Sequence, residues 1–203
     1  MQSNAEEELI LRCQQGDKMA FAQLVRANQK LVFNLLYRLV PVGMDIDDLA
    51  QDVWVKVYQS IGKVKNASSF RTWLHRVALN TYYDKVRKTS PKIESLDEMT
   101  GGEDDHREYN RFEVPDPSLI PEDKLLSDEW KKHVEQKIQL LPEQYRIVLV
   151  MRDVQNLSYD EIAEITELSL GTVKSRLARA REKLVSELSD YFKDKEVNVN
   201  VSR

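Results

Sequence analysis

Apolar residues recur at helical spacing through the first half of the chain and predict helices up to Arg87. Between residues 21 and 39 they fall mostly three or four positions apart, the period of an amphipathic helix. They are Phe21, Leu24, Val25, Leu31, Val32, Leu35, Leu36 and Leu39. Gly16 and Asp17 predict the end of one helix and the N-cap of the next. Pro41 and Gly43 predict the end of the long helix.

A further helix is predicted directly after this break. Asp45, Asp47 and Asp48 are typical of a helix N-terminus, where the helix dipole favours carboxylates. The apolar stripe of this helix follows at helical spacing: Leu49, Val53, Trp54, Val57 and Ile61. The next residues, 62–69, predict a loop.

The stretch SFRTWLHRVALNTYYDKVRK, residues 69–88, mixes four aromatic residues with five Arg or Lys. On a helical wheel one side is expected to be buried: Phe70, Leu74, Val77 and Thr81, with Trp73 at its edge. Another face carries a stripe at i, i+4, i+7 and i+11: Arg76, Asn80, Tyr83 and Arg87. Such a stripe suits single-stranded nucleic acid, with phosphates on Arg and a base on the ring. An ordinary surface helix with an exposed Tyr explains it equally well at this point.

The periodicity vanishes between residues 89 and 121, where the chain becomes acidic. From Thr89 to Asp123 there are eleven Asp or Glu and three Lys or Arg, whereas the net charge of all 203 residues is −4. Prolines and a Gly-Gly pair predict an extended linker. The remainder of the chain is therefore basic, which favours nucleic acid as a partner.

Helical periodicity resumes after Pro121. The apolar positions of the next helix are Leu126, Trp130, Val134, Ile138 and Leu141. Pro142 suits the first turn of a further helix that runs through Tyr145, Val148 and Met151. A frayed tail is expected after Phe192, with a weak strand pattern in VNVNV at residues 197–201.

The strongest local pattern is LSYDEIAEITELSLGTVKSRLARAREKL, residues 157–184. Ser158 and Glu161 predict a capping box at the start of a short helix. Ser169 can cap a second helix that has Thr172 at its third position. A short helix, a tight turn and a longer basic helix indicate a helix-turn-helix.

The second helix of this motif separates into faces. The inward face is Val173, Leu177, Ala180 and Leu184, and the opposite face is Ser175, Ala178, Arg179 and Glu182. Lys174 and Arg181 flank one edge, and Thr172, Arg176 and Lys183 flank the other. The far face is expected to enter a major groove and the edges to meet phosphates, with Arg181 assigned to phosphate or to contacts within the fold. The alternative is a helix whose basic face is only solvated.

Composition narrows the class further. Hydrophobic residues make up 41% of the chain and charged residues 32%, and no apolar run approaches eighteen residues. The acidic start argues against a signal peptide. The single cysteine, Cys13, excludes an internal disulfide, so a cytoplasmic location is expected. Cys13 lies on an apolar helix face and is expected to be a buried thiol. His75, His106 and His133 lack ligand spacing, and no glycine-rich phosphate loop is present. We expect no metal, no cofactor and no enzymatic activity.

Taken in order, these motifs resemble the bacterial sigma factors. DDLAQDVWVKVY, SFRTWLHRVALN, an acidic linker, LPEQYRIVLVMRDVQNLSYDEIAEI and GTVKSRLARARE are most similar to the extracytoplasmic-function (ECF) group of the sigma-70 family. The resemblance spans about residues 9–188. It implies an all-α fold of two small helical domains: region 2 at 1–90, an acidic linker at 91–122, region 4 at 123–192, and a flexible tail at 193–203.

The resemblance also implies function and partners. The chain is expected to bind the β′ and β subunits of core RNA polymerase and to direct the polymerase to promoter DNA in stress-responsive transcription. An anti-sigma factor is expected to hold the chain, and no membrane insertion is expected. Because Phe70 and Trp73 are expected in the core, its power to melt DNA should be modest. The alternative is a conventional helix-turn-helix regulator whose helical N-terminal domain senses a signal or dimerises.

Site residues follow from the resemblance and the helical wheels together. The surface expected to bind the β′ subunit is Asp48, Gln51, Asp52 and Val55, whose carboxylates should be free to pair with Arg on the partner. The loop and stripe expected to read the −10 element are Lys63, Lys65, Asn66, Arg76, Asn80, Tyr83 and Arg87. The surface expected to bind the −35 element is Thr172, Lys174, Ser175, Arg176, Ala178, Arg179 and Lys183.

Overall fold

The computed structural model describes residues 2–41, 43–64, 66, 69–89 and 128–200, and within these ranges it is helical without a strand. The elements in chain order are α1 (Gln2–Gln14), α2 (Lys18–Leu39), α3 (Ile46–Ser60), η1 (Ile61–Lys63), α4 (Phe70–Thr89), α6 (Asp128–Leu140), α7 (Glu143–Leu149), η5 (Val150–Val154), α8 (Tyr159–Thr166) and α9 (Leu170–Asn200). The expected all-α class is confirmed. The expected linker at 91–122 lies outside the described residues.

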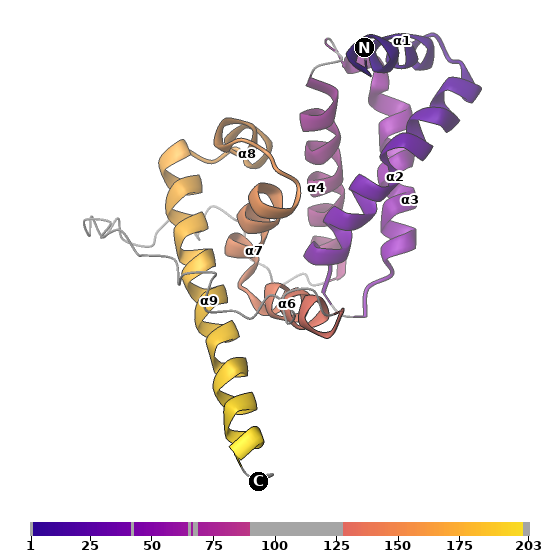
Figure 1. Cartoon of the computed structure of the whole chain (residues 1–203). Helices are drawn as coiled ribbons and strands as arrows, with labels where there is room; N and C mark the ends of the chain where they lie inside the picture. The colour runs from indigo at the N-terminus through magenta and orange to yellow at the C-terminus, as the bar shows by residue number, and fades with distance from the viewer. Residues whose placement is uncertain (1, 42, 65, 67–68, 90–127, 201–203) are drawn as a thin grey trace.

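Helices α1 to α4 form one bundle, called here the N-terminal bundle (Figure 1). α2 packs against α1 and α3, and α3 packs against α4. Asp17 caps α2 by accepting hydrogen bonds from the backbone N–H of Met19 at 2.9 Å and Ala20 at 3.0 Å. Gly16 precedes it at a φ of +86°, a left-handed conformation that glycine adopts readily. The helix ends predicted at Gly16, Asp17 and Asp45 are confirmed.

Helices α6 to α9 form the C-terminal bundle, in which α9 packs against α6, α7 and α8. The capping box of α8 is present: the Glu161 N–H donates to Ser158 Oγ at 3.2 Å, and the Ser158 N–H donates to Glu161 Oε2 at 2.8 Å. Glu167 then takes a φ of +60°, which turns the chain toward α9. The Thr172 N–H donates to Ser169 Oγ at 3.1 Å. The predicted helix-turn-helix is therefore confirmed.

Three local features differ from the sequence expectations. Pro142 stands at the N-cap of α7 rather than within its first turn. The chain widens into a π-helical turn at η5, where the Gln155 N–H donates to the Val150 carbonyl at 3.0 Å. α9 continues to Asn200, so residues 193–200 are helical where a frayed end and a weak strand pattern were expected.

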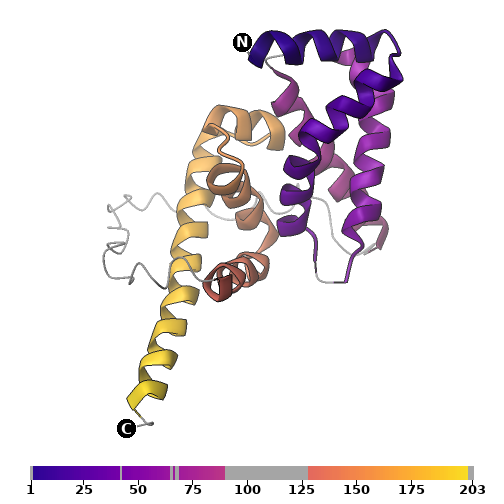
Figure 2. The ribbon, with the colours of Figure 1, turned by 45° about the vertical axis from the view of Figure 1, so that its right-hand side comes forward.

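The two bundles pack against each other. α4 contacts α8, and α2 contacts α6, α7 and η5. Figures 1 and 2, which differ by a 45° turn, both place α7 and α8 beside the N-terminal bundle. The buried apolar side chains of both bundles, except Trp130, belong to one hydrophobic cluster. Among the described residues, no helix is both long enough and apolar enough to cross a membrane.

Candidate nucleic-acid and partner interfaces

The first half of α9 separates an apolar face from a basic one, as the wheel predicts. Val173, Leu177 and Ala180 are buried. Lys174, Ala178, Arg179 and Lys183 are exposed, whereas Thr172, Ser175 and Arg176 are half-buried. A helix held by its apolar face and exposing cations opposite to it can enter a DNA groove and contact phosphates along its edges.

Arg181 is also exposed, but its guanidinium is engaged in a contact within the fold. Its Nη2 donates to Asp153 Oδ1 at 2.5 Å, and its Nε donates to Asp153 Oδ2 at 3.1 Å. The hydrogen bond to Asp153 also raises the pKa of the Arg181 guanidinium. A two-pronged contact of this kind fixes α9 against η5. Of the two roles that the sequence left open for Arg181, the structure supports the contact within the fold.

The stripe on α4 is divided by its surroundings. Arg76 donates to the backbone carbonyl of Glu164 on α8, and its Nη2 lies 3.7 Å from the Glu164 carboxylate. Tyr83 is half-buried, and burial followed by the charge of Glu143 raises its pKa to about 12, against the influence of Arg176. Asn80 and Arg87 are exposed. Half of the stripe therefore faces solvent, and the other half faces the C-terminal bundle.

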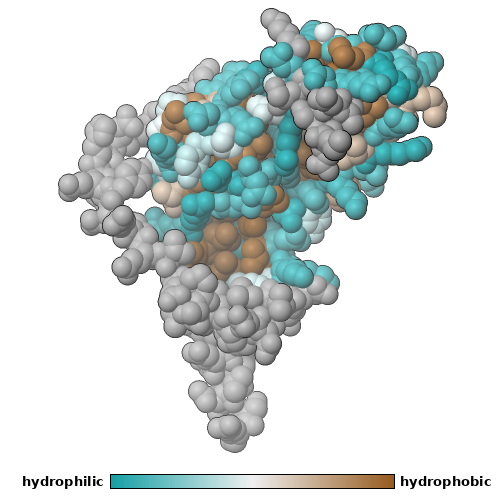
Figure 3. All heavy atoms as spheres, turned by 45° about the horizontal axis from the view of Figure 1, so that its top comes forward, coloured by the Kyte–Doolittle hydropathy of each residue, from teal (hydrophilic) through white to brown (hydrophobic). Residues whose placement is uncertain are grey.

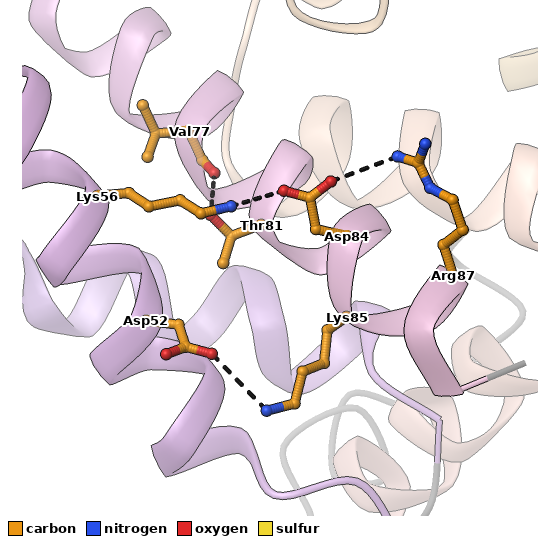
Figure 4. A network of polar contacts seen from close by, with 7 residues as sticks. All are labelled: Asp52, Lys56, Val77, Thr81, Asp84, Lys85 and Arg87. Atoms are coloured by element: carbon orange, nitrogen blue, oxygen red, sulfur yellow. Dashed lines mark hydrogen bonds and ion pairs between the residues drawn. The ribbon is translucent and has the colours of Figure 1, made fainter.

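The opposite side of α4 is core, as predicted. Phe70 and Leu74 are fully buried, and Thr81 is 2% exposed. The Thr81 hydroxyl donates to the Val77 carbonyl one turn earlier at 2.7 Å (Figure 4). Val77 and Trp73 are half-buried.

The four side chains expected to dock RNA polymerase are all exposed on α3: Asp48, Gln51, Asp52 and Val55. The carboxylates are not free, however, because Lys85 of α4 lies 2.5 Å from Asp48 and 3.7 Å from Asp52. Figure 4 shows Lys85 reaching from α4 toward Asp52 on the neighbouring helix. The hydrogen bond to Asp48 raises the pKa of Lys85. The carboxylates are exposed as expected, but the pairing with Lys85 was not foreseen, since the sequence gives no sign of a lysine that packs across from the next helix.

An open groove of about 520 Å³ adjoins these residues between α2 and α3. Gln51 and Asp47 line it together with Phe33 and Trp54. Phe33 is 41% exposed although it is aromatic. Figure 3 shows that hydrophobic side chains also reach one face of the molecule in patches, on a mostly hydrophilic surface. The sequence pattern did not single out Phe33 as a surface residue. The signal that could have indicated it is the position of an aromatic residue off the apolar stripe of its helix.

The loop expected to receive a −10 base is supported from α1. Gln14 Nε2 donates to the carbonyls of Ile61 at 3.2 Å and Val64 at 2.8 Å. Lys63 and Asn66 are exposed on this loop, whereas Lys65 lies outside the described residues. Gln14 is a supporting residue that the sequence did not indicate.

Other titratable residues serve the packing. Cys13 is buried as expected, and burial raises the pKa of its thiol. His75 is fully buried, and burial lowers its pKa. Within the described residues no three His, Cys, Asp or Glu side chains are grouped so that they could hold a metal ion.

Two family models match the chain. Residues 24–91 match "Sigma-70 region 2" and residues 132–184 match "Sigma-70, region 4". The chain is 35% identical to the "ECF RNA polymerase sigma factor SigW" of Bacillus subtilis (strain 168), over 89% of this chain and 95% of that protein. It is also 35% identical to the "ECF RNA polymerase sigma-E factor" of Escherichia coli (strain K12), over 87% of this chain and 91% of that protein.

Solved structures share the fold. A structure of CnrH in complex with the cytosolic domain of CnrY matches with a TM-score of 0.62 and 22% identity, over 92% of this chain and 98% of that one. The sigma factor RpoE of Bartonella quintana, in complex with the anti-sigma factor NepR, matches with a TM-score of 0.61 and 20% identity. The match covers 83% of this chain and 96% of that one.

Proposed function

The chain belongs to the extracytoplasmic-function group of the sigma-70 family, and from that premise we propose how its residues divide the work of a sigma factor. It is a sigma factor that binds core RNA polymerase and directs it to promoter DNA, and such initiation factors are not enzymes. The match of residues 24–91 to region 2 speaks against the alternative of a conventional regulator. Region 2 lies in the N-terminal bundle and region 4 in the C-terminal bundle, with proposed limits at 1–90 and 123–192.

Region 4 reads the −35 element with the first half of α9. The observation that carries this assignment is the exposure of Lys174, Ala178 and Arg179 opposite the buried Val173 and Leu177. Arg179 lies at the centre of the far face and contacts base edges. Ser175 and Ala178 lie beside Arg179 on that face, and the residues along the edges contact phosphates or sugars: Thr172, Lys174, Arg176 and Lys183.

Region 2 reads the −10 element with α4 and the loop before it. Asn80 offers a donor and an acceptor to one base edge, and Arg87 supplies a charge for the phosphate backbone. Arg76 and Tyr83 join this surface when region 4 leaves them, and the Tyr83 ring then stacks on an unpaired base. Lys63, Lys65 and Asn66 complete the site in the loop.

Core RNA polymerase docks on α3 and the adjoining groove. Asp48 and Asp52 pair with basic side chains of the β′ subunit. Gln51 and Val55 are exposed on the same side of α3 and belong to the same docking surface. Phe33 and Trp54 supply apolar surface in the groove. Aromatic residues are enriched at the centre of protein interfaces and polar residues form the rim, so the groove fits the centre of this docking surface and the carboxylates fit its rim.

Two further proposals come from the relatives. Since RpoE of Bartonella quintana was solved with an anti-sigma factor, we propose that an anti-sigma factor also holds this chain. Since sigma factors act on RNA polymerase, we propose a cytoplasmic location.

A pair of arginines on one helix tests the −35 assignment. Arg179→Ala is expected to weaken the free energy of promoter binding by about 1–3 kcal/mol and to relax sequence preference at one or two −35 positions. The matched control is Arg181→Ala, which removes the contact with Asp153 and is expected to lower stability without changing the order of preferred sequences. Run-off transcription with core polymerase on a panel of −35 variants measures both. An unchanged ranking with Arg179→Ala would sink the assignment.

A further inference from the structure

The entry to the −10 loop, residues 62–69, is held by a side chain of α1. Gln14 Nε2 donates to the Ile61 carbonyl at 3.2 Å and to the Val64 carbonyl at 2.8 Å. Both partners are carbonyl oxygens, which only accept hydrogen bonds, so the amide nitrogen of Gln14 must face them. The two carbonyls bracket Lys63, which is exposed. One side chain from a distant part of the sequence therefore holds the turn that presents Lys63.

The turn is also anchored on both sides of Lys63 by its own residues. The side chains of Ile61 and Val64 are buried, and the Val64 N–H donates to the Ile61 carbonyl at 3.1 Å. η1 follows α3 directly, and the last carbonyls of a helix lack partners within the helix. The amide of Gln14 therefore takes the place that water would otherwise occupy at this helix end.

The exit of the −10 loop is held by a second clamp. The N–H and the hydroxyl of Ser69 both donate to the Asn66 carbonyl, at 3.1 Å and 2.8 Å. Asn66 is exposed, and its side-chain amide offers a donor and an acceptor to a base edge. Of the two clamps, the one at Gln14 comes from a different element of the fold.

α1 is itself fixed in place, so it can position what Gln14 holds. It lies across one end of the N-terminal bundle (Figures 1 and 2). Ile10 and Cys13 on α1 are buried. Arg12 donates from Nε at 3.0 Å and from Nη2 at 2.7 Å to Asp17 Oδ2, while Asp17 Oδ1 caps α2. Gln14 therefore extends from a corner that is tied to the next helix rather than from a loose helix end.

We propose that Gln14 is a positioning residue for −10 recognition: it holds the carbonyls of Ile61 and Val64 so that the loop presents Asn66 to the DNA in one geometry. The proposal rests on the assignment of the −10 loop to the −10 element. A recognition loop that is ordered before binding does not lose binding free energy to ordering, and it holds its reading group where only the matching base fits. Gln14 thus acts on base choice through the loop and not by contact with DNA.

Hydrogen exchange of the free full-length chain tests the clamp without DNA. Gln14→Met removes the donor and keeps the length of the side chain, and Gln14→Glu turns a carboxylate toward two carbonyl oxygens. The matched control is Gln15→Met, because Gln15 is the adjacent glutamine and is exposed. Exchange in the peptide 61–69 should rise several-fold in Gln14→Met and further in Gln14→Glu, and should stay at the wild-type rate in Gln15→Met. Wild-type exchange in both Gln14 variants would overturn the clamp.

Transcription with core polymerase on a panel of −10 variants tests the consequence for base choice. Gln14→Met should reduce the preference for the favoured base at the position read by the loop by about 3- to 10-fold, the effect of losing one or two hydrogen bonds. The ranking of −35 variants and the affinity for core polymerase should remain those of the wild type. An equal loss on every −10 variant would mean that Gln14 only stabilises the bundle.

A double-mutant cycle separates this proposal from the function on which it rests. Asn66→Ala removes the group through which Gln14 is proposed to act, and the base preference that it relaxes identifies the position read by the loop. Gln14→Met combined with Asn66→Ala should then lose no more preference at that position than Asn66→Ala alone. Additive losses would overturn the positioning role and leave the loop assignment standing. An unchanged −10 preference in Asn66→Ala would instead refute the loop assignment, and the role of Gln14 would fall with it.

Discussion

The ammonium group of Lys85 lies 2.5 Å from Oδ2 of Asp48 and 3.7 Å from Oδ2 of Asp52, so one lysine of α4 pairs with both carboxylates proposed to dock RNA polymerase. A basic side chain of the polymerase has to displace Lys85 before it can pair with either carboxylate. Exposed ion pairs of this kind contribute about 0.2–1 kcal/mol. The polymerase therefore competes with a weak internal partner.

Removing this competitor should strengthen docking. We expect Lys85→Met to raise the affinity for core polymerase by roughly 1.5- to 5-fold at low salt, with the gain shrinking as salt screens the charges. Competition against labelled wild-type protein for a limited amount of core polymerase measures it. Lys56→Met is the matched control, because Lys56 pairs with Asp84 at 2.7 Å on the same two helices (Figure 4). A lower affinity for Lys85→Met than for this control would mean that Lys85 itself supports docking.

Phe70 should contribute to stability rather than to DNA contacts. Its side chain is fully buried, and its ring centroid lies 5.9 Å from that of Trp73. Phe70→Ala is expected to cost about 3–5 kcal/mol of unfolding free energy, because it leaves a cavity that the bundle cannot close. Urea denaturation gives the value. A loss below about 1 kcal/mol would contradict a core role for the ring.

Asn80 should affect promoter reading without affecting stability. It is exposed on α4, so Asn80→Ala is expected to change the unfolding free energy by less than about 0.5 kcal/mol. Transcription from duplex promoters should fall, and discrimination among −10 variants should stay poor even on templates already opened across the −10 region. Wild-type discrimination on open templates would show that Asn80 is ordinary surface. Tyr83→Ala is a less direct probe, because it also removes a contact with region 4.

The folding stability of the chain should depend on pH through His75. Burial lowers the pKa of His75, against the opposing hydrogen bonds with Arg71 and Gln155. The unfolded chain therefore binds a proton more readily than the folded one, and stability is lost as pH falls below about 6.5 toward the lowered pKa. His75→Gln should lack this contribution. Thermal melts from about pH 7.5 to about pH 5.5 compare the two proteins. Parallel pH profiles would argue against the titration of His75.

Features governed by neighbouring residues were predictable. The capping residues Asp17, Ser158 and Glu161 and the inward face at Val173 and Leu177 were found from the sequence, since caps and helical periodicity depend on residues within a turn or two of one another. The order of such local motifs was also enough for the resemblance to sigma factors. The extension of α9 to Asn200 was missed because its end carries no strong stop signal.

Features that depend on distant residues were not predictable. The partner of Arg76 is Glu164, 88 positions away, and the partner of Asp48 is Lys85, 37 positions away. Each residue on its own looks like a solvated surface charge. Only the packing of α4 against α3 and α8 decides which charges meet, and no local pattern records that packing.

The shared hydrophobic cluster of the two bundles has a calorimetric consequence. Because buried apolar residues of regions 2 and 4 form one cluster, heat should unfold the described helices of the wild-type chain in a single transition whose van't Hoff and calorimetric enthalpies agree. Thr72 is buried on α4, and its hydroxyl donates to Glu161 Oε1 of α8 at 3.0 Å. Thr72→Arg would therefore divide that cooperative unit, and two broader peaks, one for each region, should replace the single endotherm. The number of peaks would then report how strongly one region's folding depends on the other.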